Sequence, residues 1–299
     1  MSSPLSENTY VERLGHFAAA LNVPYGIERS VKVAAQGLIG GRALISFHRD
    51  DLLAAGGWDK VATLLAQCGL DQQYHPPLAA AFESAELIHF GLQDAPQLAV
   101  YEPWLAANNS RKLVMKMYFE SQSVAPHDPQ WSVREWHNPG ISPHYLAYKW
   151  HVDGAPVATH YGRSPALDDG PVGAVVATSQ GQLPSLLKAG IQSLLEACNR
   201  QLASAQSQLL IVVEPATKRR SIDANLYTAN LVLEDVQSLL LSVLAIVSPT
   251  NRAALEHWLA ANNRAQLGHL AWGCGRQNEP FITCYYGVRE VASGVSFVK

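Results

Sequence analysis

The segment RKLVMKMYFE, residues 111–120, carries the pattern that decides the fold. Six of its ten residues are large and apolar or aromatic, which is typical of a buried β-strand. Lys116 nevertheless lies in the middle of the run. Lysine is almost never fully buried without a partner, because an ammonium group loses strong hydration when it leaves water. The segment therefore raises the question of what Lys116 faces.

Alternation within this segment separates two faces. Successive residues of a strand point to opposite sides of a sheet. Met115, Met117 and Phe119 therefore share an apolar face, which helices would cover. Lys116 and Tyr118 share the opposite face, which is polar in its middle.

A polar residue, any residue and then tyrosine recur on four predicted strands. The pairs are Lys116/Tyr118, Thr159/Tyr161, Asn225/Tyr227 and Thr283/Tyr285. Two interpretations stay open. The polar faces are either solvated, as in many half-exposed sheets, or they line the interior of a closed barrel. Four tyrosines at matching positions favour the barrel interior, because a solvated face has no need of them.

The rest of the chain alternates paired strands with helices. Asp153-Gly154, between two β-like runs, is the strongest hairpin signal. Short turns between neighbouring strands make them antiparallel. A sheet of about ten such strands tends to curl or close, which removes its edges. Strands are predicted at 42–48, 86–92, 97–102 and 113–119 and in hairpins at 145–163, 208–227 and 267–288; helices at 6–21, 56–67, 184–202, 233–247 and 251–262; and a turn at the glycine-rich segment 37–41.

One six-residue word occurs twice in the chain. WLAANN stands at 104–109 and at 258–263, each time before a predicted strand. Both copies have the composition of a helix end followed by an asparagine stop, which indicates an internal repeat.

Composition indicates a globular protein and excludes several classes. The chain has 299 residues, 48% hydrophobic and 16% charged, with a formal net charge of −3. This balance does not favour nucleic acid as a partner. No apolar run approaches the roughly 20 residues of a membrane span, and the start lacks a signal-peptide pattern. Four cysteines without a CxxC pair predict a reduced, cytoplasmic protein.

The polar-x-Tyr strands resemble the ABBA-type aromatic prenyltransferases. The best-matched piece is Lys116-Met117-Tyr118-Phe119, followed by YLAYKWHVDG (145–154) and EPFITCYYG (279–287). Among the subfamilies, the spacing is most similar to the cyanobactin peptide prenyltransferases. The resemblance implies an α+β fold: one domain over residues 1–299, in which repeated ααββ units build a closed antiparallel ten-stranded β-barrel with its helices outside.

The resemblance also implies a function. Such an enzyme moves a dimethylallyl or geranyl group from its diphosphate to an indole, a phenol or a peptide side chain by electrophilic substitution. Cationic and neutral side chains would bind the diphosphate, and tyrosines would add hydroxyls and stabilise an allylic cation through their ring faces. The implied diphosphate-binding set is Arg42, Lys116, Tyr118, Thr159, Tyr161, Asn225, Tyr227, Thr283 and Tyr285.

The acidic residues bear on two questions, whether a metal is required and which group accepts the proton. Asp50-Asp51 and Asp168-Asp169 lack the third aspartate of a DDxxD run, so no metal is expected to be required and magnesium is optional. Relatives often carry an acidic residue on the first strand, near the acceptor, where this chain has Lys32. The candidate substitutes are Glu28, Asp223, His269 and Glu214.

The acceptor contacts come from two places. Trp136 lies in the irregular segment 121–144, which has the character of a binding loop. His269 lies in the last hairpin.

Two other functions remain open for the same barrel. One is a non-catalytic barrel that binds a hydrophobic ligand or peptide, for which Arg42 and Lys116 would be dispensable. The other is an enzyme of another reaction type, such as a cyclase or a hydrolase of small polar substrates.

Overall fold

The computed structural model describes ten strands and seven α-helices within residues 7–35, 37–94, 113–121, 142–151, 154–164, 184–201, 208–214, 219–275 and 279–292. The strands are β1 (Tyr25–Ala34), β2 (Gly37–His48), β3 (Leu87–Asp94), β4 (Leu113–Glu120), β5 (Ser142–His151), β6 (Val157–Ser164), β7 (Gln208–Glu214), β8 (Arg219–Asn225), β9 (Leu267–Cys274) and β10 (Pro280–Val291). The helices are α1 (Glu7–Leu21), α2 (Arg49–Ala54), α3 (Gly57–Gln67), α4 (His75–Ser84), α8 (Ser185–Gln201), α9 (Gln237–Val247) and α10 (Arg252–Asn262).

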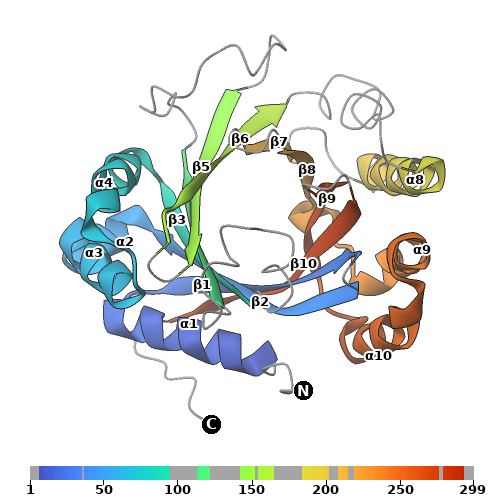
Figure 1. Ribbon diagram of the computed structural model, residues 1–299, viewed down its shortest axis with the longest axis horizontal. Helices are drawn as coiled ribbons and strands as arrows, with labels where there is room; N and C mark the ends of the chain where they lie inside the picture. The colour runs from blue at the N-terminus through green and yellow to red at the C-terminus, as the bar shows by residue number, and fades with distance from the viewer. Residues whose placement is uncertain are drawn as a thin grey trace. The chain divides into compact units, whose positions relative to one another are not determined.

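The strands form a closed barrel in the order β1-β10-β9-β8-β7-β6-β5-β4-β3-β2 (Figure 1). Strand neighbours in this order are also neighbours in sequence, apart from the closure between β1 and β10. The pairings β2–β3, β3–β4, β4–β5, β7–β8, β8–β9 and β9–β10 are antiparallel. The predicted fold class, a closed ten-stranded antiparallel barrel, is confirmed.

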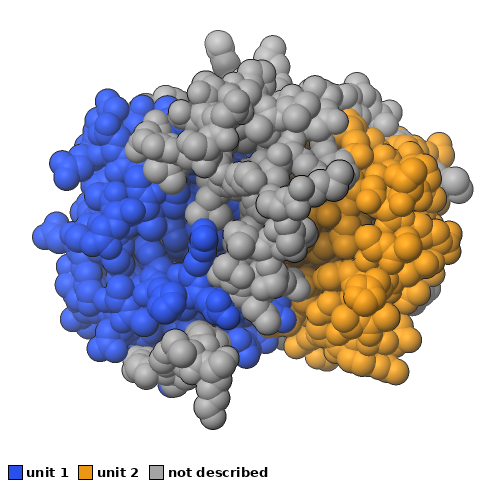
Figure 2. Space-filling model, turned by 60° about the horizontal axis from the view of Figure 1, so that its bottom comes forward, with its two compact units in different colours: residues 1–29, 41–161, 288–299 blue, residues 30–40, 162–287 orange. Residues whose placement is uncertain are grey.

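The chain divides into two compact units, coloured separately in Figure 2. Unit 1 comprises residues 1–29, 41–161 and 288–299, and unit 2 comprises residues 30–40 and 162–287. Each unit has its own helices and its own hydrophobic core. The single domain over residues 1–299 stays a prediction.

In unit 1 the apolar face of the sheet packs against α1, α3 and α4. The predicted alternation of β4 is confirmed on this side, because Met115, Met117 and Phe119 are 2%, 2% and 3% exposed. They belong to one continuous cluster with the helix residues. Phe17 of α1 stacks on Phe90 of β3 with ring centroids 4.2 Å apart, which fixes the helix on the strand.

In unit 2 the apolar face of β8–β10 packs against α8, α9 and α10. Ile222, Trp272 and Ile282 of the strands belong to one buried cluster with helix residues such as Leu187 of α8 and Leu240 of α9. Hydrophobic burial therefore accounts for the outer side of both units.

The structure corrects the prediction for the first strands. The segment 37–41 is part of β2 rather than a separate turn, and Gly37 alone adopts a positive φ, of 99°, where the chain leaves β1. A side chain there would also meet Asn251, whose amide nitrogen lies 2.7 Å from the position of a Cβ. The predicted strand 42–48 is consequently the second part of β2, and Arg42 lies inside this strand instead of at its start.

Two helices were not predicted. α2 has only six residues, and α4 begins with His75-Pro76-Pro77, which suits a first helical turn. The predicted strand at 97–102 and the first WLAANN word lie outside the described residues. The second word ends α10 before β9, as expected. Among the described residues no helix is long and apolar enough to span a membrane.

Replacing Phe90 tests how unit 1 is held together. Phe90→Ala removes a buried ring that contacts both Phe17 and Trp150. We expect a loss of about 3–5 kcal/mol in the free energy of unfolding, measured by urea titration, because the cavity cannot be refilled. Leu53→Ala is the control: this side chain is 44% exposed and should change stability by less than about 0.5 kcal/mol. Equal losses in the two variants would contradict the described packing.

Candidate functional site

Lys116 faces a second lysine across the sheet. The register of β4 and β5 pairs Lys116 directly with Lys149, and directly opposed residues share a face. Met115 and Met117 point towards the helices, so both lysines lie on the inner face of unit 1, the side of the sheet turned away from the helices. Like charges at such a pair destabilise a sheet. An anion that binds near both ammonium groups would reduce their repulsion, so the pair is suited to an anionic ligand.

Two neighbours complete the surroundings of this pair. Gly91 of β3 is the partner of Lys116 on its other side, and a Cβ there would lie 3.1 Å from Leu44 and 3.7 Å from the Lys116 Cβ. Leu44 therefore packs closely over Gly91, beside Lys116. Arg42 of β2 is only 7% exposed and lies two residues before Leu44 on the same face. The inner face of unit 1 therefore carries three cationic side chains at its Arg42 end.

Four aromatic rings lie in mutual contact next to the lysine pair. Tyr118 and Tyr145 each contact both His89 and Tyr161, with ring centroids between 5.7 and 6.3 Å apart. The predicted partners Tyr118 and Tyr161 are thus brought together, whereas Tyr145 was not predicted. Thr159 precedes Tyr161 by two residues on β6 and shares its face. Such a wall of tyrosine rings can stabilise a cation.

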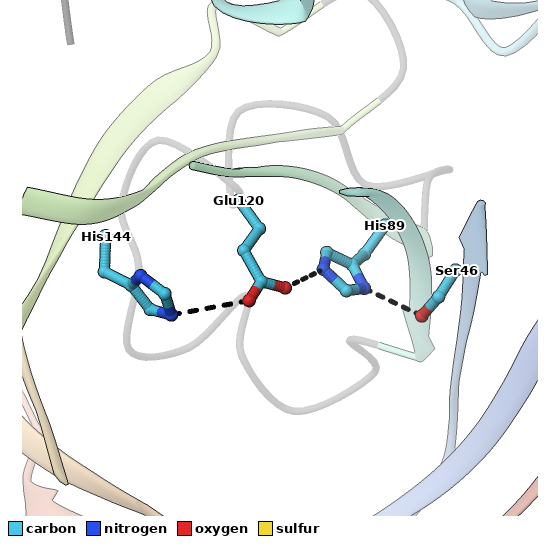
Figure 3. A network of polar contacts seen from close by, with 4 residues as sticks. All are labelled: Ser46, His89, Glu120 and His144. Atoms are coloured by element: carbon cyan, nitrogen blue, oxygen red, sulfur yellow. Dashed lines mark hydrogen bonds and ion pairs between the residues drawn. The ribbon is translucent and has the colours of Figure 1, made fainter. Parts of the chain in front are cut away.

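Beside these rings, a chain of polar contacts runs across the sheet from β2 to β5 (Figure 3). Ser46 Oγ of β2 lies 2.7 Å from Nδ1 of His89 on β3, and Nε2 of His89 lies 3.2 Å from Oε2 of Glu120 on β4. The other oxygen of Glu120 is 3.4 Å from Nε2 of His144, an ion-pair distance. The side chains of His89, Glu120 and His144 are 13%, 15% and 5% exposed, so the network is largely shielded from water.

Glu120 remains a carboxylate in this buried position. Burial alone would raise its pKa, but contacts with the imidazoles of His144 and His89 outweigh burial and hold the pKa well below the usual range. A carboxylate only accepts hydrogen bonds. Nε2 of His89 therefore donates to Glu120, and in the neutral ring Nδ1 accepts the hydroxyl proton of Ser46. Among the described residues, no cluster of histidine, cysteine and acidic side chains is arranged to hold a metal ion.

Unit 2 carries a second polar cluster on its own inner face. The register sets Asn225 of β8 and Tyr285 of β10 on either side of His269 on β9. Nδ1 of His269 lies 2.9 Å from Oδ1 of Asp223. The rings of Tyr227 and Tyr285 meet His269 edge-on, with centroids 4.9 and 5.8 Å away. The candidates Asp223 and His269 thus form one carboxylate–imidazole pair between two of the predicted tyrosines.

Tyr227 does not lie on a strand, which corrects its predicted position. β8 ends at Asn225, and Tyr227 begins a 3-10 turn that runs to Ala229. Oδ1 of Asn225 accepts a hydrogen bond from the backbone N–H of Tyr227 at 3.3 Å, a local side-chain contact that ends the strand. The carbonyl side of Asn225 is therefore used in the turn, which leaves its amide N–H groups as the donors suited to a ligand.

The remaining candidates lie on the same inner faces or outside the described residues. Thr283 of β10 is 3% exposed. Lys32 lies over the ring of Phe281, with its ammonium 4.3 Å from the ring centroid, so the position expected to be acidic instead makes a cation–π contact. The candidate acids Glu28 and Glu214 are 5% and 2% exposed. Trp136 lies outside the described residues.

Comparison with solved structures identifies the same barrel in enzymes of very different sequence. The 5-dimethylallyltryptophan synthase from Streptomyces coelicolor matches with a TM-score of 0.56 and 13% identity, over 91% of this chain and 82% of that protein. The prenyltransferase PriB, in its complex with the product diphosphate, matches with a TM-score of 0.53 and 13% identity, over 87% and 79%. The apo form of PriB also matches with a TM-score of 0.53, at 12% identity. No protein-family model matches the chain, and no curated protein matches it in sequence. At these identities the likeness establishes the fold that the chain shares with aromatic prenyltransferases.

Glu120→Gln tests the electrostatics of the polar network. The folded-state pKa of Glu120 lies below its unfolded value of 4.5, so its stabilising contribution is fully present above about pH 4.5 and is lost as pH falls through the folded pKa. We expect the variant to be about 1–3 kcal/mol less stable at pH 7, the usual range for hydrogen bonds to a charged group.

The measurement is urea unfolding of both proteins between pH 2 and pH 8, so that it extends well below pH 4.5, where the contribution is lost. Glu256→Gln provides the control, because Glu256 forms an exposed ion pair with Arg252 on α10 and such pairs contribute little. A Glu120→Gln variant as stable as the wild type at pH 7 would show that the two imidazoles do not stabilise the carboxylate.

Proposed function

We propose that this protein transfers a prenyl group from an isoprenoid diphosphate to an electron-rich acceptor. The observation that carries the proposal is the cross-strand pair of Lys116 and Lys149 beside the tyrosine wall of unit 1. A diphosphate supplies the negative charge that this pair favours. A prenyl group that leaves it as an allylic cation is matched by the tyrosine ring faces.

The cationic side chains support metal-independent binding of the donor. An ammonium about 4 Å from a phosphate oxygen gains on the order of 4 kcal/mol at an effective dielectric constant near 20, before desolvation is subtracted. Lys116 and Lys149 act as point charges, and Arg42 adds a planar fork of donors. Three such groups neutralise much of a diphosphate, so magnesium would be optional. Thr159, Asn225 and Thr283 would add neutral hydrogen bonds.

The reaction is an electrophilic substitution. The bond between the prenyl carbon and the diphosphate oxygen breaks with its electron pair on the oxygen, and the acceptor forms a new bond to the prenyl carbon. The half-buried tyrosine rings would limit the access of water to the cation. A dimethylallyl or a geranyl group fits this scheme. Transfer is favoured over simple binding of a hydrophobic ligand because the lysine pair and the tyrosine rings lie side by side, which suits a diphosphate and an allylic group of one donor.

Indole, phenol and peptide side chains are the acceptor classes we propose. The shared fold of a 5-dimethylallyltryptophan synthase supports an indole. The similarity of the strand spacing to the cyanobactin peptide prenyltransferases supports a side chain within a peptide. His269 and Trp136 are the proposed acceptor contacts.

Calorimetric binding of thiolodiphosphate analogues tests the proposal. We expect dimethylallyl or geranyl thiolodiphosphate to bind with a micromolar Kd that persists when magnesium is chelated. Lys116→Ala and Lys149→Ala should each weaken binding about tenfold or more, which corresponds to about 1.4 kcal/mol or more. Lys188→Ala is the control, because this lysine lies on helix α8, away from the inner face. If neither analogue binds, the proposal is contradicted and a barrel that binds another ligand is favoured.

Gly91→Leu tests whether a ligand lies beside the lysine pair. The added side chain would displace Leu44, whose Cδ1 lies 3.1 Å from the position of the new Cβ on the same inner face. We expect loss of analogue binding together with some loss of stability, while the secondary structure by circular dichroism stays the same. Gly40→Leu is the control for adding leucine at an open position, since a Cβ at Gly40 meets no atom within 4 Å. Unchanged analogue binding in Gly91→Leu would place the diphosphate elsewhere.

A further inference from the structure

The contacts of His89 resemble those of a base that is oriented by a carboxylate. Oε2 of Glu120 accepts a hydrogen bond from the ring Nε2–H, which leaves Nδ1 as the acceptor for the Ser46 hydroxyl at 2.7 Å. When a hydroxyl is hydrogen-bonded to an imidazole that a carboxylate orients, the imidazole can take the hydroxyl proton while the oxygen forms a new bond. In a relay, that new bond would be to a proton from the acceptor. The anion site needs none of these three groups.

The position of this chain of contacts relative to the anion site follows from the register within unit 1. Ser46 is paired with His89, and His89 with Tyr118. Lys116 precedes Tyr118 by two residues on the same face, which separates the two rows by about 7 Å along the strand. The row that contains Tyr118, His89 and Ser46 therefore lies within reach of a prenyl group whose diphosphate is bound at the lysine pair.

We propose that Ser46, His89 and Glu120 form a proton relay that accepts the proton lost by the acceptor during prenyl transfer. The inference rests on the proposed function, because it assigns a role within that reaction. Ser46 Oγ is the group that touches the acceptor. His89 receives the proton of the serine, and Glu120 positions the ring and stabilises it once charged.

The proton balance of the step is complete. The acceptor forms its bond to the prenyl carbon and gives its proton to Ser46 Oγ, while the original hydroxyl proton of Ser46 moves to Nδ1 of His89. The imidazolium that results lies 3.2 Å from a carboxylate. His144 holds the other carboxylate oxygen. The proton leaves to water after the product departs, which restores the hydroxyl and the neutral ring.

The groups around His89 are compatible with this role. Ser46 faces it from β2, Tyr118 and Glu120 from β4, and Tyr145 from β5. Glu120 is the single acidic group in direct contact with the ring among these, and it contacts the nitrogen opposite to the serine. A separate carboxylate–imidazole pair, Asp223 and His269 in unit 2, is the competing proton acceptor, and the experiment below distinguishes the two.

The test compares prenylated product with released diphosphate in the same sample. Dimethylallyl diphosphate is supplied with L-tryptophan, with L-tyrosine or with a cyclic peptide that contains both residues. We expect Ser46→Ala and Glu120→Gln to lower the product formed per diphosphate released about 100-fold, within the usual range for losing a proton acceptor. Ser46→Thr, which keeps a hydroxyl, should retain most of the product yield. The Kd of the thiolodiphosphate analogue should stay within about twofold in all three variants.

A second measurement does not depend on turnover. ¹⁵N-histidine NMR reports which ring nitrogen carries a proton. The relay requires His89 to be neutral at pH 7 with its proton on Nε2, and Glu120→Gln should alter this signal. A doubly protonated His89 at pH 7 would overturn the relay, because such a ring cannot accept a proton.

Each alternative has its own outcome. Wild-type product yield in both Ser46→Ala and Glu120→Gln overturns the relay and leaves the proposed function intact. A 100-fold loss in Asp223→Asn alone assigns the proton to the pair in unit 2. Covalent labelling of Ser46 by a fluorophosphonate would identify a nucleophile instead of a relay. Failure of the wild type to bind the analogue or to release diphosphate removes the proposed function together with the relay, and calorimetry identifies that case.

Discussion

The opposition of Lys116 and Lys149 across β4 and β5 is the constraint on which the inner face of unit 1 depends. A sheet that places two ammonium groups on directly paired positions loses stability from their repulsion. Folding therefore has to be driven by the other side of these strands. Met115, Met117 and Trp150 are each 2% exposed or less, and they pack into a cluster shared with the helices. Burial of this apolar face offsets the repulsion and keeps both lysines on the inner face.

The same separation of an apolar outer face from a polar inner face explains the composition of the strands in both units. Each described strand of unit 2 that contributes to the polar cluster also contributes to its core, because alternate residues face opposite sides. Asp223 follows Ile222, and Thr283 follows Ile282, with each isoleucine 3% exposed or less. The apolar residues fix the register, since a slip by one residue would move the polar set into the core. Packing of the outer face therefore fixes the positions of the polar residues on the inner face.

Alternation within single strands was predictable from the sequence, whereas the pairing between strands was not. The faces of β4 followed from residues 113–119, and the closed barrel followed from the antiparallel pairs and the resemblance. Glu120 was missed although it continues the face of Lys116 and Tyr118, because its partners His89 and His144 lie on other strands. The segments 95–112 and 121–141 join those strands, and a connection of that length does not fix a register as a two-residue turn does. Lys149 was missed for the same reason. Tyr227 was misplaced because the Asn225 side chain ends the strand through a local contact that β-propensity does not include.

The spacing along β4 explains how a carboxylate and two lysines coexist on one face. Lys116 and Glu120 are four residues apart, which places their Cα atoms about 13 Å from each other. Glu120 is stabilised locally by contacts with His89 and His144, whose nitrogens lie 3.2 and 3.4 Å from its oxygens. The positive charge of the lysines therefore lies apart from the carboxylate, and Tyr118 lies between the two regions. A single strand thus separates an end suited to an anion from an end suited to accepting protons, and a reaction that expels an anion and releases a proton needs both.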